Sequence, residues 1–194
     1  GSTDNTAEIV KQFNDSRISY IKKNNTGVSD TRNVGAMISK GEILSFLDAD
    51  DIWLPENLGK KVEKLINESQ CVLVYSSMFL WDERENYKNC RIIKKIFYND
   101  WEKFRNLMTP AIPSSAIIKR NCFFEAGMFD TNISTSADFD LAIRLRELGE
   151  FGYLDEPLVL YRSHPSQMHN NIALYKHDMI YILKKYKYNS NLFP

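Results

Sequence analysis

One short apolar run, at residues 43–47, restricts the fold of this chain more than any other part of its sequence. The run reads Ile-Leu-Ser-Phe-Leu and is bounded by Gly41 on one side and by acidic residues on the other. It is too short for a buried helix, and such runs are typical of strands that are covered on both faces. We therefore expect residues 43–47 to form a central parallel strand in a sheet with helices on both sides.

Helical and strand-like segments alternate along the rest of the chain. Helical patterns occur in these segments: 3–14, 29–40, 55–66, 101–107, 121–126, 138–148 and 172–188. Strand-like patterns occur in these: 17–22, 43–47, 72–75, 115–119, 151–154 and 158–162. The polar stretch 81–95 is expected to leave the sheet. This order predicts one α/β domain over residues 1–194, with a mixed, mostly parallel sheet flanked by helices.

The composition is that of an ordinary folded protein and excludes several classes. The 194 residues are 43% hydrophobic and 26% charged, and 25 Lys and Arg balance 25 Asp and Glu. A chain without net charge or a basic run lacks the footprint of a general nucleic-acid binder. The three cysteines show no paired spacing, which argues against a zinc site and favours a reducing compartment. With no apolar signal segment or membrane-spanning run, a cytoplasmic location is expected.

Acidic residues follow directly on the predicted strand 43–47. Asp48, Asp50 and Asp51 lie within four residues, and open α/β sheets bind ligands at the carboxyl ends of their strands. Three such carboxylates repel one another unless a cation lies among them, and Mg²⁺ and Mn²⁺ prefer oxygen ligands. A divalent metal that bridges a diphosphate is one interpretation. A solvated acidic turn before the next helix is the other, and the spacing alone favours neither.

Two acids in the first turn of the predicted helix 138–148 face different sides. Asp138 shares a face with Leu141 and Leu145 and points toward the core. Desolvation there would raise its pKa, as suits a base that lines a cleft, although a helix-capping role fits the sequence alone better. Asp140 falls on the face of Arg144, and we expect it to be a surface partner of that residue.

A basic segment, Tyr161-Arg162-Ser163-His164, ends the last predicted strand. Either Arg162 or His164 could face a phosphate or a metal at the same edge of the sheet. A single histidine is more often structural, so the segment alone leaves both interpretations open.

In chain order, five segments share sequence motifs with one known family. They are Gly1-Ser2-Thr3-Asp4 (the end of a DDGSxD turn), Asn25 to Gly35 (N-x-G-x-x-x-x-R-N), Phe46 to Asp51 (FLDxDD), Ser136 to Leu145 (EDxDLxxRL), and Glu156 to His164 (EPLxxYRxH). The chain resembles the inverting nucleotide-sugar glycosyltransferases of family 2, which have the Rossmann-like GT-A fold. The match runs through most of the chain.

The resemblance implies a donor site, a metal site and a base. The donor would be a nucleotide-diphosphate sugar, most simply a UDP-sugar, held with Mn²⁺ or Mg²⁺. The implied roles are Asp50 and His164 for the metal, Asp48, Asp51 and Arg32 for the donor, and Asp138 as the general base. The acceptor would be a saccharide or a lipid-linked hydroxyl in bacterial cell-surface polysaccharide or glycolipid synthesis, with peripheral contact at the inner face of the membrane.

The chain departs from the family pattern at two places. Ala137 replaces the usual Glu before the base, so acceptor binding is expected to differ. The sequence also opens inside the DDGSxD turn, and we expect an amino-terminally incomplete domain with weak or no activity. Its unpaired sheet edge would invite a partner strand or a homodimer. Residues 1–80 would be the rest of the nucleotide-binding half, 81–165 the acceptor side, and 166–194 a carboxy-terminal helix.

Two other functions stay open at this point. An acidic strand end also fits a Mg²⁺-dependent phosphate-transfer enzyme, and Ala137 also fits a non-catalytic sugar-nucleotide-binding or assembly module. The segment 172–188 combines lysines with Tyr and Ile. It could rest on an anionic membrane, but packing against the domain is the favoured expectation.

Overall fold

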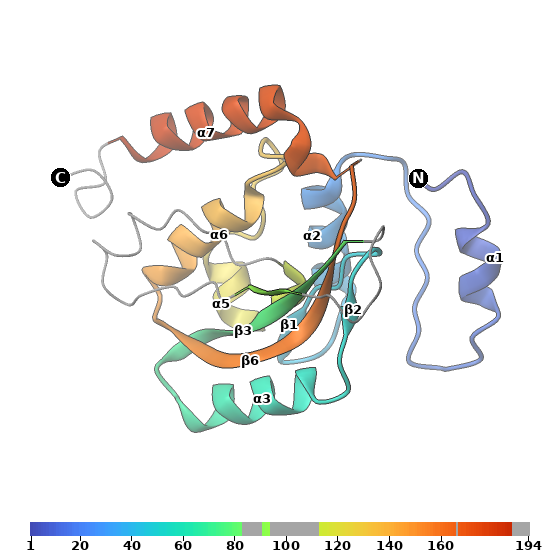
Figure 1. Cartoon of the computed structure of the whole chain (residues 1–194), viewed down its shortest axis with the longest axis horizontal. Helices are drawn as coiled ribbons and strands as arrows, with labels where there is room; N and C mark the ends of the chain where they lie inside the picture. Colours follow the sequence, from blue (N-terminus) through green and yellow to red (C-terminus); the bar gives the residue numbers. More distant parts are fainter. Residues whose placement is uncertain (83–90, 94–112, 166, 188–194) are drawn as a thin grey trace.

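The computed structural model shows a mixed sheet of six strands with helices on both faces (Figure 1). It describes residues 1–82, 91–93, 113–165 and 167–187. The strands are β1 Ile43–Ser45, β2 Ile52–Trp53, β3 Cys71–Asp82, β4 Arg91–Ile93, β5 Ala116–Lys119 and β6 Glu150–Ser163. Their order across the sheet is β1-β5-β3-β6-β2, and β4 pairs with β3 off this path.

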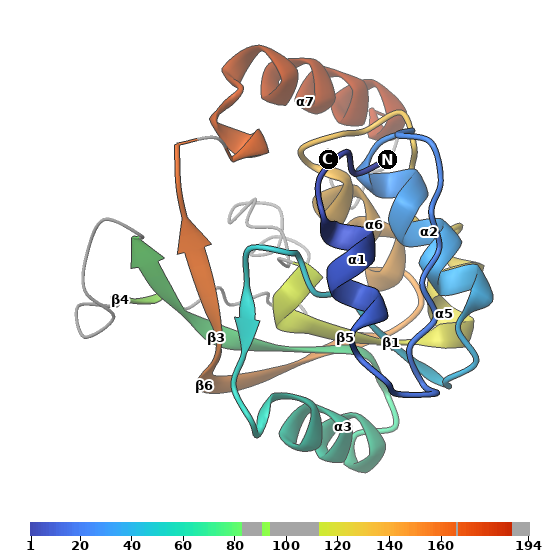
Figure 2. The same ribbon diagram turned by 90° about the vertical axis from the view of Figure 1, so that its right-hand side faces the viewer.

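The helices form layers on either side of this sheet. They are α1 Thr6–Lys11, α2 Val28–Ile38, α3 Asn57–Asn67, α5 Arg120–Glu125, α6 Ala137–Arg146 and α7 Ile172–Tyr186, with short 3-10 turns η2 Pro113–Ser115 and η3 Met168–Asn170. Helix α3 covers one face, and α2, α5 and α6 lie on the other, with α7 outside α6 (Figures 1 and 2). Among the described residues, no helix combines the length and apolarity needed to cross a bilayer.

Strand direction differs from the expectation. Among the described strands, β3 and β6 pair in parallel, and the other four pairings are antiparallel. The prediction of a mixed sheet flanked by helices is confirmed, but the predicted excess of parallel pairing is wrong. Strand β1 is also not central, because it ends the strand order and pairs with β5. The expected cover on both faces is wrong as well, because only Leu44 of β1 is buried and Leu47 is 47% exposed. The direction of a strand depends on where the chain re-enters the sheet, which a short apolar run does not encode.

Two other strand predictions need correction. Residues 17–22 form no strand, and Ile18, Tyr20 and Ile21 stay exposed. A strand needs a neighbour to pair its amide groups, and none of the described strands lies beside this segment. The two predicted strands at 151–154 and 158–162 are one strand, β6, whose register against β3 shifts near Pro157.

The expectation that residues 81–95 leave the sheet is wrong for their described part, because β3 extends to Asp82 and β4 pairs with β3. Most other elements form where the sequence predicts them, and the predicted helix 101–107 lies outside the described residues. Alternate side chains of the sheet enter two cores. On β3, Leu73 and Tyr75 join the larger core with Leu141 of α6 and Ile182 of α7. Val74 enters the smaller core beneath α3. This alternation is the two-residue period of a strand. The larger core fixes α6 against the sheet, and with it the position of Asp138.

Candidate donor and acceptor site

The end of β6 meets the acidic turn that follows β1. His164 Nε2 lies 3.0 Å from Asp50 Oδ2, although 114 residues separate the two in sequence. The Arg162 amide donates to Asp51 Oδ1 at 3.2 Å, and Arg162 Nε donates to the Asp50 carbonyl oxygen at 3.1 Å. The structure thus brings Asp50, Asp51, Arg162 and His164 together at one edge of the sheet.

Helix α2 contributes Arg32 to the same edge. Its guanidinium pairs with the Asp48 carboxylate and lies 5.5 Å from the centre of the Phe129 ring. The Asp48 amide donates to Ser114 Oγ at 3.0 Å, which fixes the backbone of the turn. The side chains of Asp48 and Asp50 remain 32% and 38% exposed, so both can reach a ligand.

Asp51 lies deeper than its two neighbours. Burial raises the pKa of its carboxyl to about 6, while the nearby Ser114 hydroxyl and the Arg162 amide act in the opposite direction. Its Oδ2 has no hydrogen-bond partner among the described residues. Asp51 therefore contributes a buried oxygen behind the exposed carboxylates, and its contact with Arg162 ties the turn to β6.

A metal would find two side-chain ligands at this edge. Within the described ranges, no group of three or more His, Cys, Asp or Glu side chains is arranged to hold an ion. The Asp50 carboxylate and the His164 imidazole supply one oxygen and one nitrogen donor, a set that suits Mn²⁺. Such a pair leaves coordination positions for oxygens from another molecule, as a diphosphate would provide. The residues present therefore fit a metal that is shared between protein and ligand.

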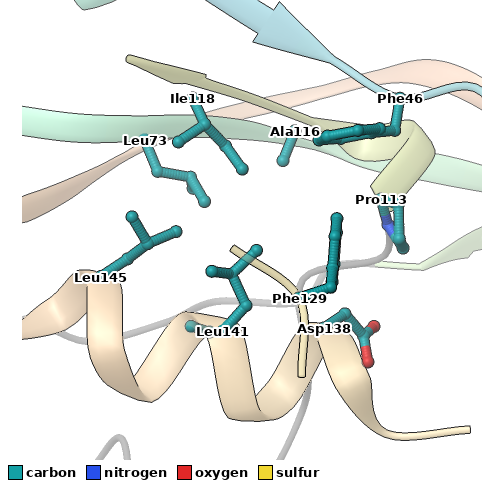
Figure 3. Close-up of a pocket in the computed structure, with 10 residues that line it drawn as sticks. Phe46, Leu73, Pro113, Ala116, Ile118, Phe129, Asp138, Leu141 and Leu145 are labelled. Atoms are coloured by element: carbon teal, nitrogen blue, oxygen red, sulfur yellow. The ribbon is translucent and has the colours of Figure 1, made fainter. Parts of the chain in front are cut away.

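Asp138 lies at the other side of the site, in the first turn of α6. A cavity of about 20 Å³, room for about one water, separates this helix from the sheet. It is lined by Phe46, Leu73, Pro113, Ala116, Ile118, Phe129, Asp138, Leu141, Ala142 and Leu145. Figure 3 shows Asp138 at one end of this lining, beside Phe129, with its carboxylate turned away from the apolar side chains. The predicted face shared with Leu141 and Leu145 is confirmed, but Asp138 is only half-buried and its carboxylate does not point into the core. Phe46, two residues before Asp48, links the cavity to the acidic turn.

The prediction that Asp140 lies at the surface is wrong. Its partner is Arg144, as expected, but the carboxylate is fully buried and not at the surface. Two groups of α7 also reach it, with Lys185 Nζ at 2.8 Å and Tyr186 Oη at 2.9 Å from Oδ1. Burial and the nearby Asp140 charge raise the pKa of the Tyr186 hydroxyl. The helix pattern of α6 could not reveal this burial, because α7 supplies the cover.

Two residues that position the site were missed in the sequence. Asp178 of α7 is fully buried and accepts hydrogen bonds from the Ser134 amide at 3.1 Å, the Thr135 amide at 2.6 Å and Thr135 Oγ1 at 2.8 Å. Asp178 therefore holds the segment that leads into Asp138. An acid on the apolar side of the predicted helix 172–188 was the available signal.

Asn33 is the second missed residue. Its Nδ2 donates to the Phe129 carbonyl oxygen at 2.9 Å, and its Oδ1 accepts from the Phe129 amide at 3.0 Å. This reciprocal pair fastens α2 to the loop that precedes α6. Asn33 directly follows Arg32, so one turn of α2 serves both sides of the site.

The chain has the GT-A fold of solved glycosyltransferase structures. TarS of S. aureus, residues 1–349 in complex with UDP-GlcNAc, is similar with a TM-score of 0.70 and 18% identity over 95% of this chain and 54% of that one. The mannosyltransferase PcManGT from Pyrobaculum calidifontis, in complex with GDP-Man and Mn²⁺, gives a TM-score of 0.63 and 16% identity over 95% of this chain and 52% of that one.

Sequence relatives identify the family. Residues 1–185 match the family described as "Glycosyltransferase like family 2", and the chain belongs to it. Glycosyltransferase GlyA of Streptococcus pneumoniae serotype 4 is 28% identical over 184 residues, which are 91% of this chain and 25% of that protein. The uncharacterized glycosyltransferase MJ1057 of Methanocaldococcus jannaschii is 28% identical over 159 residues, 80% of this chain and 54% of that protein. The chain thus spans between a quarter and about half of these relatives.

Proposed function

We propose that this chain binds a nucleotide-diphosphate sugar together with Mn²⁺ or Mg²⁺ and transfers the sugar to a hydroxyl acceptor with inversion. The observation that carries the proposal is the 3.0 Å contact between Asp50 and His164, which joins an oxygen and a nitrogen donor at the carboxyl end of the sheet. Family membership favours sugar transfer over the alternative of phosphate transfer.

The donor side would be built from the acidic turn and α2. Asp50 and His164 would hold the metal, and a bound divalent ion stabilises negative charge on a leaving diphosphate. The Arg32 guanidinium, held in place by Asp48, adds a fixed positive charge at the same edge. Similar proteins support this assignment, since TarS is in complex with UDP-GlcNAc and PcManGT with GDP-Man and Mn²⁺. A UDP-sugar remains the proposed donor.

The acceptor side would be built around Asp138. Its carboxylate would take the proton from the acceptor hydroxyl while that oxygen forms a bond to the anomeric carbon and the bond from this carbon to the diphosphate breaks. Attack from the side opposite the leaving group inverts the configuration and needs no covalent intermediate. The first turn of α6 suits this role because Asp178 and the larger core fix its position.

Calorimetric titration of UDP in the presence of Mn²⁺ tests the donor site. We expect wild-type binding that disappears without metal and in Asp50→Ala. Glu63→Ala serves as the control, because Glu63 is an exposed acid of α3 on the opposite face of the sheet. Absence of binding in the wild type, or equal binding in Asp50→Ala, would contradict the proposal.

A further inference from the structure

Helix α7 has one face that packs on the domain and one that does not. Asp178 and Ile182 on the inner side are buried, which confirms the expected packing of this segment. In two views at right angles, α7 is the outermost element on its side of the molecule and lies over α6 (Figures 1 and 2). Its opposite side therefore faces outward.

The outer face of α7 combines apolar and cationic side chains. Ile172, Ile180 and Leu183 are 67%, 53% and 45% exposed, respectively. Lys176 and Lys184 are exposed on the same side of the helix. At 3.6 residues per turn, these five residues fall within a sector of about 120°. The acid of α7, Asp178, lies on the inner side, so the five residues form an apolar face with positive charge and no acid of the helix.

The charge on this face indicates what covers it. Because the acid of α7 lies on the inner side, Lys176 and Lys184 give the outer face of this helix two positive charges. A second copy that docked through the same face would bring lysines against lysines. An anionic membrane matches both features, because its headgroups attract lysines while its acyl boundary accepts Ile and Leu. We propose that the outer face of α7, defined by Ile172, Lys176, Ile180, Leu183 and Lys184, docks the protein on an anionic membrane surface.

Docking through α7 would place the acceptor side of the site near the membrane. The same helix holds the segment before Asp138 through the bonds of Asp178 to Ser134 and Thr135. A lipid-borne acceptor would then be concentrated on the side of the molecule where α7 covers α6, the helix that carries Asp138. This last step rests on the proposed function, whereas membrane binding itself does not.

Co-sedimentation with vesicles tests the docking face. We expect wild-type protein to bind phosphatidylcholine vesicles that contain phosphatidylglycerol and to bind pure phosphatidylcholine far less. The variant Lys176→Gln/Lys184→Gln should bind about 25-fold more weakly, at about fivefold for each lysine. The control Lys11→Gln/Lys40→Gln makes the same change in net charge at exposed lysines away from α7 and should bind as the wild type does.

The apolar part of the face needs its own variant. Ile180→Ser/Leu183→Ser should also weaken binding to the anionic vesicles, with an unchanged helical circular dichroism spectrum. The proposal is overturned if the two lysine double variants lose binding equally, or if the serine double variant binds as the wild type does. It is also overturned if the wild type does not bind vesicles but binds acidic peptides. Asp50→Ala should keep full vesicle binding, so failure of the donor site and failure of the docking face are distinguishable.

Discussion

Because of Lys61 in α3, we expect the free energy of unfolding of this protein to increase as the pH rises above 7. Its side chain is fully buried, and its ammonium lies 3.0 Å from Asn57 Oδ1. Among the described residues it makes no ion pair. Burial lowers the pKa of Lys61 from 10.5 to about 7, because the low-dielectric interior disfavours the charged form.

The sign of the effect follows from the two pKa values. Between pH 7 and pH 10.5 the unfolded chain binds more protons at Lys61 than the folded chain, so the free energy of unfolding increases with pH. The increase begins near the folded pKa and ends near the unfolded one. From pH 6 to pH 8.5, these pKa values give an increase of about 2 kcal/mol.

Urea denaturation at pH 6 and pH 8.5 measures this increase. In Lys61→Met, which keeps the length of the side chain without its charge, we expect stability to vary by about 2 kcal/mol less between the two pH values than in the wild type. Lys40→Met, at an exposed position, is the matched control and should behave as the wild type does. If wild type and Lys61→Met differ by the same amount at both pH values, the reasoning is refuted.

Three further predictions concern the site and the sheet. Asp178→Ala should lower the free energy of unfolding by about 3 kcal/mol, because it leaves the amides of Ser134 and Thr135 unpaired. A loss below about 0.5 kcal/mol in urea denaturation would contradict this prediction. Gly149→Ala should cost about 1–3 kcal/mol in the same assay, since the new Cβ would lie 2.6 Å from Val72 Cγ1, whereas Gly35→Ala meets no atom within 4 Å and should be neutral or stabilising. Asp138→Asn should reduce sugar transfer by about 10²–10⁴-fold with unchanged UDP binding by calorimetry; undiminished transfer would instead favour a non-catalytic module.

The sequence predicts those features that depend on local spacing. The face that Asp138 shares with Leu141 and Leu145 follows from helical periodicity within one segment. The strands at 72–75 and 115–119 and the helix 138–148 are placed correctly for the same reason. The acidic turn after residues 43–47 is also a local feature, and the structure places it at a sheet edge as expected.

Features that depend on distant partners were not predictable in this way. The burial of Asp140 requires α7, which begins some thirty residues later. The direction of β5 beside β1 depends on the path of the chain through residues 46–115, and no pattern within 116–119 encodes it. Residues 17–22 alternate correctly for a strand but lie beside none of the described strands. In each case the local pattern is present, but burial, strand direction or strand pairing is decided by segments that lie elsewhere in the sequence.

Two consecutive residues of α2 connect the acidic turn and the loop before α6. Arg32 pairs with Asp48 in the acidic turn, and Asn33 exchanges two hydrogen bonds with Phe129 before α6. An inserted residue between them would turn the rest of the helix by about 100° and carry one of the two away from its partner. Such an insertion would therefore break at least one of these two links, whereas an insertion in an exposed loop would leave both in place.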